Sequence, residues 1–208
     1  MITSPDAEIS GGRGARERIL RTAARLFYEE GIHATGIARL TKAAHVSTRT
    51  FYQHFPSKNA LVEEYLRRFE TEEEAPPPER QLDRTDLGPA ERLLAIFCTG
   101  PQISVVRGCP FHNAAVEAAG EMPQAAEVVE RHKAHFLRRL AETAAEAGAR
   151  DPERLARHLA VVYEGGRALA TSCNDPQAVE DARQVAEALL REHLDDGIQN
   201  DSAACSDH

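Results

Sequence analysis

The residues from Thr48 to His54 carry the side chains whose types and spacing best fit a chemical task. Phe51 and Phe55 are four residues apart, so in a helix both would face inward. The side chains that then face outward are those of Thr48, Arg49, Tyr52 and Gln53. Arginine can bind O6 and N7 of guanine with two hydrogen bonds, and threonine can contact the methyl group of thymine. This pattern predicts contacts to base edges in the major groove of DNA.

Further residues of this region suit contacts to the DNA backbone. Tyr52 and His54 can reach phosphate oxygens, which position a protein without reading the base sequence. Lys58 starts the next helix, where its charge and the unpaired N–H groups would hold another phosphate. Each has a plainer interpretation: Arg49 and Gln53 as a solvated face, Tyr52 as a partly buried core residue, and His54 as a cap.

These side chains need a particular arrangement of helices to present them. Apolar residues recur at helical spacing over residues 16–30, and Gly31 ends that helix. A short helix over 36–44 follows, and then a turn in which Ser47 caps a helix over 48–54. Two short helices joined by a tight turn are typical of a helix-turn-helix motif.

The charge of the chain is unevenly distributed. The 208 residues carry a formal net charge of −8, which by itself argues against a nucleic acid partner. Residues 11–58, however, hold nine Lys and Arg against three acids, a net charge of +6, and residues 59–208 carry −12. Phosphate binding needs local positive charge rather than a positive total, so the basic segment remains compatible with DNA.

Over residues 13–62 the chain resembles the DNA-binding domain of the TetR family of bacterial regulators. The resemblance rests mainly on the tract from Val46 to Lys58, VSTRTFYQHFPSK, followed by Leu61. Further matches are Arg18-Ile19-Leu20, Ala23-Ala24, Leu26-Phe27 and Gly31. It implies an all-α fold, with an N-terminal three-helix helix-turn-helix domain and a larger helical ligand-binding and dimerisation domain.

The resemblance also implies a function. We expect a homodimer that binds double-stranded operator DNA and represses transcription until a small-molecule effector releases it; activation instead of repression stays open. The DNA-contacting residues carried over from the family pattern are Thr35, Thr48, Arg49, Thr50, Tyr52, Gln53, His54 and Lys58. Thr35 has a plainer role as a cap of the second helix or a neighbour of one. Arg13, Arg16 and Arg18 would form either a solvated face or a basic arm on DNA.

The turn departs from the family pattern at one position. Where the family has glycine, this chain has His45. A residue that directly follows a helix in such a turn commonly needs a positive φ. A side chain in that conformation costs about 1–2 kcal/mol, although histidine is among the better tolerated residues. We therefore predict a left-handed His45 and a stabilising effect of His45→Gly.

The remainder of the chain has helical periodicity with few strand signals. Three consecutive prolines at 76–78 favour a stiff segment. Helices are expected at about 89–104, 110–119, 122–147, 151–173 and 175–194. The predicted organisation is a disordered N-terminus (1–12), the helix-turn-helix domain (13–58), a linking helix (59–74), a Pro-rich linker (75–88), a helical effector-binding and dimerisation domain (89–194) and a disordered tail (195–208).

Two sets of residues in the C-terminal part are candidates for further binding roles. Aromatic and polar residues that could line an effector pocket are Phe97, Phe111, His112, Asn113, Glu117, His135 and Tyr163. Apolar stripes on the last two helices predict a dimer interface formed by Leu155, Leu159, Val162, Gly166, Val179, Ala182, Ala186 and Leu189. In the plainer interpretation, these stripes bury only against their own chain. Gly165-Gly166 suggests close approach of a partner helix or a ligand.

The sequence argues against several other classes of protein. No apolar run is long enough for a transmembrane helix, and the N-terminus lacks the pattern of a signal peptide. The four cysteines show no CxxC pair, which disfavours a structural zinc site and predicts free thiols in a cytoplasmic protein. Neither a catalytic constellation nor a metal site is apparent, so we expect no cofactor and no enzyme activity. An enzyme or an effector-independent interaction module built on the C-terminal helices is the alternative.

Overall fold

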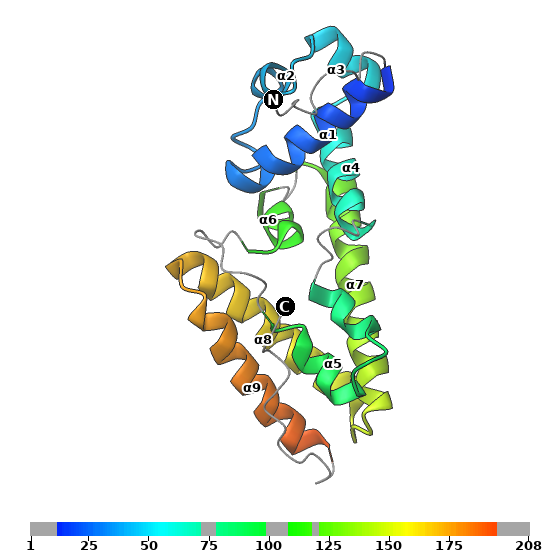
Figure 1. Ribbon diagram of the computed structural model, residues 1–208, viewed down its shortest axis with the longest axis vertical. Helices are drawn as coiled ribbons and strands as arrows, with labels where there is room; N and C mark the ends of the chain where they lie inside the picture. Colours follow the sequence, from blue (N-terminus) through cyan, green and yellow to red (C-terminus); the bar gives the residue numbers. More distant parts are fainter. Residues whose placement is uncertain (1–11, 72–77, 99–107, 118–120, 195–208) are drawn as a thin grey trace, which may run out of the picture. The chain divides into compact units, whose positions relative to one another are not determined.

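The computed structural model describes residues 12–71, 78–98, 108–117 and 121–194, and over these residues it is helical with no strand (Figure 1). The elements are α1 (Gly12–Glu29), α2 (Ile37–Ala43), α3 (Thr48–His54), α4 (Lys58–Thr71), the 3-10 helix η1 (Pro78–Asp83), α5 (Pro89–Ala95), α6 (Pro110–Glu117), α7 (Pro123–Glu146), α8 (Pro152–Cys173) and α9 (Gln177–His193). The all-α fold class is confirmed. The tail over 195–208 and nearly all of the predicted disordered N-terminus lie outside the described residues.

Packing divides the chain into two units that interleave along the sequence. The first unit comprises Met1–Thr71 with Pro110–Val129, and the second comprises Glu72–Cys109 with Glu130–His208. Helix α6 and the start of α7 therefore pack with the N-terminal helices, whereas most of α7 packs with α5, η1, α8 and α9. The predicted Pro-rich linker contains η1, and the helix predicted over 89–104 ends at Ala95, before Gly100-Pro101.

The core of the first unit follows the apolar periodicity of the sequence. Helix α1 packs against α2, α3 and α4. Its buried side chains are Ile19, Ala23, Leu26 and Phe27. Phe27 meets Tyr65 of α4 edge to face, with ring centroids 5.6 Å apart. Because the same α1 stripe touches three helices, it fixes the orientation of the short helices α2 and α3.

The core of the second unit centres on the α8–α9 pair, which runs side by side in Figure 1. Gly166 of α8 permits this close approach, because a Cβ atom there would lie 2.5 Å from the Cβ atom of Ala182. The predicted close approach therefore occurs at Gly166, but to α9 of the same chain. Gly165 faces open space.

The predicted dimer stripes need a correction on the same grounds. Six of the eight residues are buried within their own chain, namely Leu155, Leu159, Gly166, Val179, Ala182 and Ala186. The other two, Val162 and Leu189, are half-buried and pack against the same core. Helical periodicity marked buried faces correctly, but those faces meet each other within one chain.

Two smaller expectations can also be compared with the structure. Among the described residues, no helix is long and apolar enough to cross a membrane. Cys109 and Cys173 carry thiols, but Cys98 is disulfide-bonded, so the prediction of free thiols is wrong for that residue.

Candidate nucleic-acid interface

The turn between α2 and α3 is held by backbone hydrogen bonds that end α2. Val46 N–H donates to the Thr41 carbonyl (3.0 Å), and His45 N–H donates to the Lys42 carbonyl (3.4 Å). This pair of bonds is the Schellman motif, which requires a left-handed residue after the helix. His45 has φ of 52°, so the predicted left-handed conformation is confirmed. The motif turns the chain sharply into α3.

Helix α3 begins with the predicted cap. The Ser47 hydroxyl accepts a hydrogen bond from the Thr50 backbone N–H (3.0 Å), and the two hydroxyl oxygens lie 2.8 Å apart. Thr50 is half-buried and its hydroxyl contacts the cap. Of the residues expected to contact DNA, Thr50 is thus already engaged in starting the helix.

The outward face of α3 carries the expected recognition residues. Phe51 and Phe55 are buried, with ring centroids 6.0 Å apart, which anchors the helix. The side chains of Thr48, Arg49 and Gln53 are exposed, and Tyr52 is 50% exposed. The ring edge of Tyr52 meets Phe51, while half of its surface remains accessible, so it is not a core residue. His54 is half-buried at the end of the helix.

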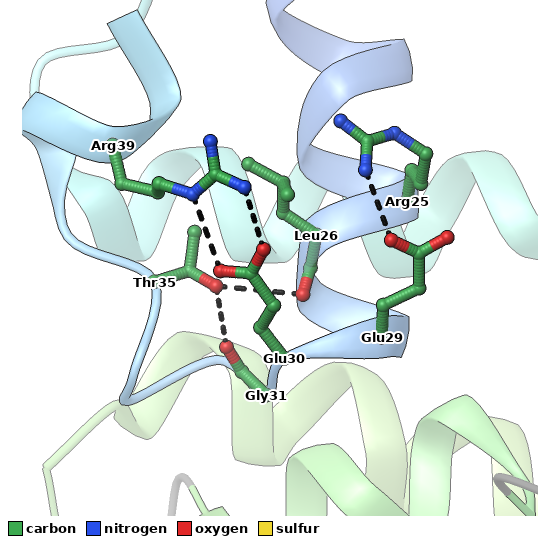
Figure 2. Close-up of polar contacts among 7 residues, drawn as sticks. All are labelled: Arg25, Leu26, Glu29, Glu30, Gly31, Thr35 and Arg39. Atoms are coloured by element: carbon green, nitrogen blue, oxygen red, sulfur yellow. Dashed lines mark hydrogen bonds and ion pairs between the residues drawn. The ribbon is translucent and has the colours of Figure 1, made fainter. Parts of the chain in front are cut away.

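Thr35 needs a correction. Its side chain is fully buried, and its hydroxyl donates to the carbonyls of Gly31 (2.7 Å) and Leu26 (3.4 Å), as Figure 2 shows. A hydroxyl that is buried and committed to two carbonyls cannot reach a phosphate. Thr35 instead ties the α1–α2 loop to the C-terminal end of α1.

Several arginines of the basic segment are paired with acids. Arg39 of α2 forms two hydrogen bonds to Glu30 (2.7 and 3.4 Å), and Arg25 pairs with Glu29 (2.9 Å) on α1 (Figure 2). The hydrogen bond from Arg39 lowers the pKa of Glu30, although burial opposes it. These exposed pairs neutralise part of the local positive charge. Arg49 is outside these pairs, so its charge becomes more important for any contact with DNA.

The arginines at the start of α1 connect helices. Arg16 pairs with Glu64 of α4 (2.9 Å) and its guanidinium lies 5.2 Å from the centre of the Phe55 ring. Arg18 Nε donates to the carbonyl of Ala44 at the end of α2 (3.4 Å). Both side chains therefore connect helices within the first unit. The sequence had indicated either a solvated face or a basic arm on DNA for them, and neither interpretation included these contacts. Arg13 is a residue whose side chain is not described.

Lys58 and the loop after α1 meet residues from α6. Lys58 Nζ donates to the His33 carbonyl (3.5 Å), and burial lowers the pKa of Lys58 while the charge of Glu117 raises it. The Glu117 carboxylate accepts from the His33 backbone N–H (2.7 Å), and the Glu117 carbonyl contacts the His33 ring. Gly31 admits this carboxylate, since a Cβ atom there would lie 3.3 Å from it. Glu117 thus holds the α1–α2 loop, a role that the sequence did not indicate.

The other predicted pocket residues are divided between the two units. Phe97 and Tyr163 are buried together in the second unit, with ring centroids 5.7 Å apart. Phe111 lies in the first unit against Phe69 of α4 (5.9 Å). The remaining candidates are exposed or half-buried: His112, Asn113 and His135.

Sequence reasoning missed a polar cluster beside Tyr163. The Tyr163 hydroxyl donates to Glu79 of η1 (3.3 Å), and Lys133 of α7 pairs with Glu164 of α8. His132 is buried next to them, and this burial together with the charge of Lys133 lowers its pKa to about 4. The available signal was the run of polar residues on α7, but residues 79 and 163 are too far apart in sequence to be paired from spacing. No group of three or more metal-ligating side chains occurs in the part of the chain that the structure describes.

A helix-turn-helix with an exposed polar recognition helix, followed by a helical second unit, defines the class of DNA-binding transcriptional regulators. Residues 19–65 match the family model described as bacterial regulatory proteins of the tetR family, and residues 90–186 match the tetracyclin repressor-like C-terminal domain. A TetR-family regulator of Streptomyces coelicolor has a solved structure with 30% sequence identity and a TM-score of 0.67, covering 88% of this chain and 97% of that one. The chain belongs to the TetR family of transcriptional regulators, which are not enzymes.

Curated relatives match over shorter stretches. The HTH-type transcriptional repressor KstR2 of Rhodococcus jostii is 39% identical over 69 residues, which is 33% of this chain and 34% of that protein. An uncharacterized HTH-type transcriptional regulator of Mycobacterium tuberculosis is 33% identical over 138 residues, 61% of this chain and 63% of its own length. The chain thus spans about a third of the first and less than two thirds of the second. A Saccharomonospora viridis regulator in complex with choline shares the fold (TM-score 0.71, 22% identity, 88% of this chain and 99% of that one).

Proposed function

We propose that this protein is a repressor that binds a pseudo-palindromic operator as a homodimer and is released by a small-molecule effector. The observation that carries the proposal is the outward face of α3, where Thr48, Arg49, Tyr52 and Gln53 are exposed above buried phenylalanines. In a dimer, two such helices would enter successive major grooves about 34–36 Å apart. Arg49 would read a base edge, while Tyr52, His54 and Lys58 would contact phosphates.

The dimer interface that we propose lies on the outer faces of α8 and α9. Val161 and Leu169 of α8 are 73% and 55% exposed, and Val185 of α9 is 50% exposed. Gly165 lies between the first two on the same helical stripe and has open space where a side chain would be. A second copy that covers this stripe would bury its apolar surface, and α8 and α9 of both copies would form a four-helix bundle.

The dimer is tested by sedimentation of Leu169→Glu at micromolar concentration. A charge at the centre of the interface would dissociate it, so we expect a monomer where the unchanged protein is a dimer. Leu137→Glu, on an exposed apolar residue of α7, is the matched control and should leave the dimer intact. A monomeric unchanged protein, or a dimeric Leu169→Glu variant, would contradict the proposed interface.

Operator recognition is tested by selecting bound sequences from a random DNA pool. We expect a two-fold symmetric consensus for the unchanged protein. Arg49→Ala should weaken binding to that consensus by about 1–3 kcal/mol and relax the base preference at one position in each half-site. Arg131→Ala, on an exposed arginine of α7, is the control and should leave both unchanged. If Arg49→Ala binds the consensus as tightly as the unchanged protein, α3 is not the reading element that we propose.

Effector release requires a small molecule that binds better to a state with the wrong spacing of the two α3 helices. Such a ligand shifts the population off DNA by no more than its differential affinity for the two states. Helix α4 follows the recognition helix directly, and we assign it the transmission of this change. Repeating the DNA selection with candidate metabolites tests release, and retention of DNA under every effector would favour an effector-independent module.

A further inference from the structure

The polar cluster of the second unit joins three separate segments. It consists of Glu79 from η1, His132 and Lys133 from α7, and Tyr163 and Glu164 from α8. Ionisable groups next to an apolar core lose favourable contacts with water, so a cluster of them destabilises the fold unless they are paired. Clusters of this kind, with shifted pKa values, are typical of ligand-binding sites.

Within the described part of the chain, Lys133 and Glu164 of this cluster form an ion pair, whereas the Glu79 carboxylate has only uncharged partners at pH 7. The Glu79 side chain is only 13% exposed, and its contacts are the Tyr163 hydroxyl (3.3 Å) and Nε2 of His132 (4.0 Å). His132 is neutral at pH 7, because burial and the nearby Lys133 lower its pKa to about 4. Among the described residues, then, no cation lies within ion-pair distance of the Glu79 carboxylate.

The surroundings of this carboxylate are aromatic. The Tyr163 ring contacts Phe97 (5.7 Å between centroids) and Phe136 (5.3 Å), and all three rings are buried. The guanidinium of Arg167 lies 5.4 Å from the centre of the Tyr163 ring. An aromatic face attracts cations through its quadrupole, and rings next to a carboxylate are the recurrent means of recognising ammonium groups.

We propose that Glu79, Tyr163 and the neighbouring rings of Phe97 and Phe136 bind a small organic cation, an amine or quaternary ammonium with an apolar body. The carboxylate supplies the counter-charge, and the rings contact the apolar body and the methyl or methylene groups around the nitrogen. This proposal rests on the proposed function, in that the cation would be the effector. A cation at this place would give the Glu79 carboxylate a partner of opposite charge.

The test is calorimetric titration of the full chain, without DNA, using benzyltrimethylammonium chloride as the probe. Benzyl alcohol keeps the ring but lacks the charge, so it should bind at least about tenfold more weakly. The reason is that interactions with a charged group contribute more to the binding free energy than neutral hydrogen bonds do. Glu79→Gln keeps an acceptor for the Tyr163 hydroxyl and removes the charge. This variant should bind the ammonium probe about tenfold more weakly than the unchanged protein does, and its affinity for benzyl alcohol should be unchanged.

Asp83→Asn is the matched control, because it removes a carboxylate of the same 3-10 helix that pairs with Arg139 instead (2.6 Å). It should leave the affinity for the probe within about twofold. Thermal denaturation without probe shows whether each variant folds, and Tyr163→Phe offers a second variant that keeps the ring. Failure of the unchanged protein to bind the probe, or equal binding by Glu79→Gln, would overturn the proposal. DNA selection without any probe reports on the proposed repressor separately.

Discussion

Replacing His45 by glycine should stabilise the first unit. His45 adopts φ of 52° in the Schellman motif that ends α2. For an ordinary L residue this conformation costs about 1–2 kcal/mol, and histidine is near the lower limit because it is enriched there. Glycine removes that cost but loses more backbone freedom on folding, roughly 0.5–1 kcal/mol. The net gain should therefore lie between nearly zero and about 1 kcal/mol.

Thermal denaturation followed by circular dichroism is the first assay. In a chain of this length, 1 kcal/mol shifts Tm by about 2–4 °C, so we expect a rise of up to that size. Amide hydrogen exchange is the second assay, since the gain belongs to the α2–α3 region and should slow exchange there but not in α8 or α9. Both assays need no DNA and no effector.

Two control variants separate backbone strain from loss of the imidazole. His45→Ala removes the ring but keeps a Cβ atom, so it should give no gain. Asn174→Gly changes the other non-glycine residue with positive φ among the described residues, at the C-terminal end of α8. Asparagine tolerates this conformation better than most residues, so Asn174→Gly should raise Tm by less than His45→Gly does. A lower Tm for His45→Gly, or an equal rise for His45→Ala, would refute the reasoning.

Three further predictions concern the loop after α1 and the buried histidine. Lys58→Ala should weaken all DNA sequences alike and reduce the slope of log affinity against log salt by about 1; a change in base preference would contradict its role as a phosphate contact. Glu117→Ala removes the acceptor of the His33 N–H and should destabilise the α1–α2 loop by about 0.5–1.5 kcal/mol, measured by amide exchange at His33; unchanged exchange would exclude the contact. His132 has a folded pKa of about 4, below its ordinary 6.5, so the unfolded state binds its proton first as pH falls. The stability of the chain should therefore fall as pH drops from 6.5 towards 4, by at most about 1.4 kcal/mol per pH unit from this group. His132→Gln should flatten that part of the denaturation profile, and an unaltered profile would count against a buried neutral histidine.

The helix-turn-helix was predictable because its signals are local. The apolar spacing of α1, the Ser47 cap and the aromatic pair Phe51 and Phe55 each act within a few residues, and the structure has all of them. The positive φ of His45 was predicted from its position after a short helix together with the glycine that the TetR pattern has there. Interactions of this range can be inferred from spacing alone.

The effector pocket and the dimer interface were less predictable. Helical periodicity shows which face of a helix is buried, but it does not show which element covers that face. Leu155 and Ala182 lie on correctly identified apolar stripes, yet these stripes cover each other in one chain. Glu117 was a pocket candidate among the aromatic and polar residues, and its contact with His33, 84 residues earlier in the chain, could not be inferred from spacing. Glu79 was not considered, because nothing local ties it to Tyr163.

Because Gly166 and Ala182 are in close contact, the substitutions that each position tolerates depend on the residue at the other. Alanine at 166 would place two Cβ atoms 2.5 Å apart, so it becomes more acceptable once position 182 has lost its own side chain. The carbonyl oxygen of Ala178, 3.2 Å from the same point, would keep the fit tight even then. A lineage that reaches alanine at 166 should therefore pass through Ala182→Gly first, and the reverse order crosses a less stable intermediate. The order of substitution, and not only the final pair, is set by how closely α8 and α9 approach.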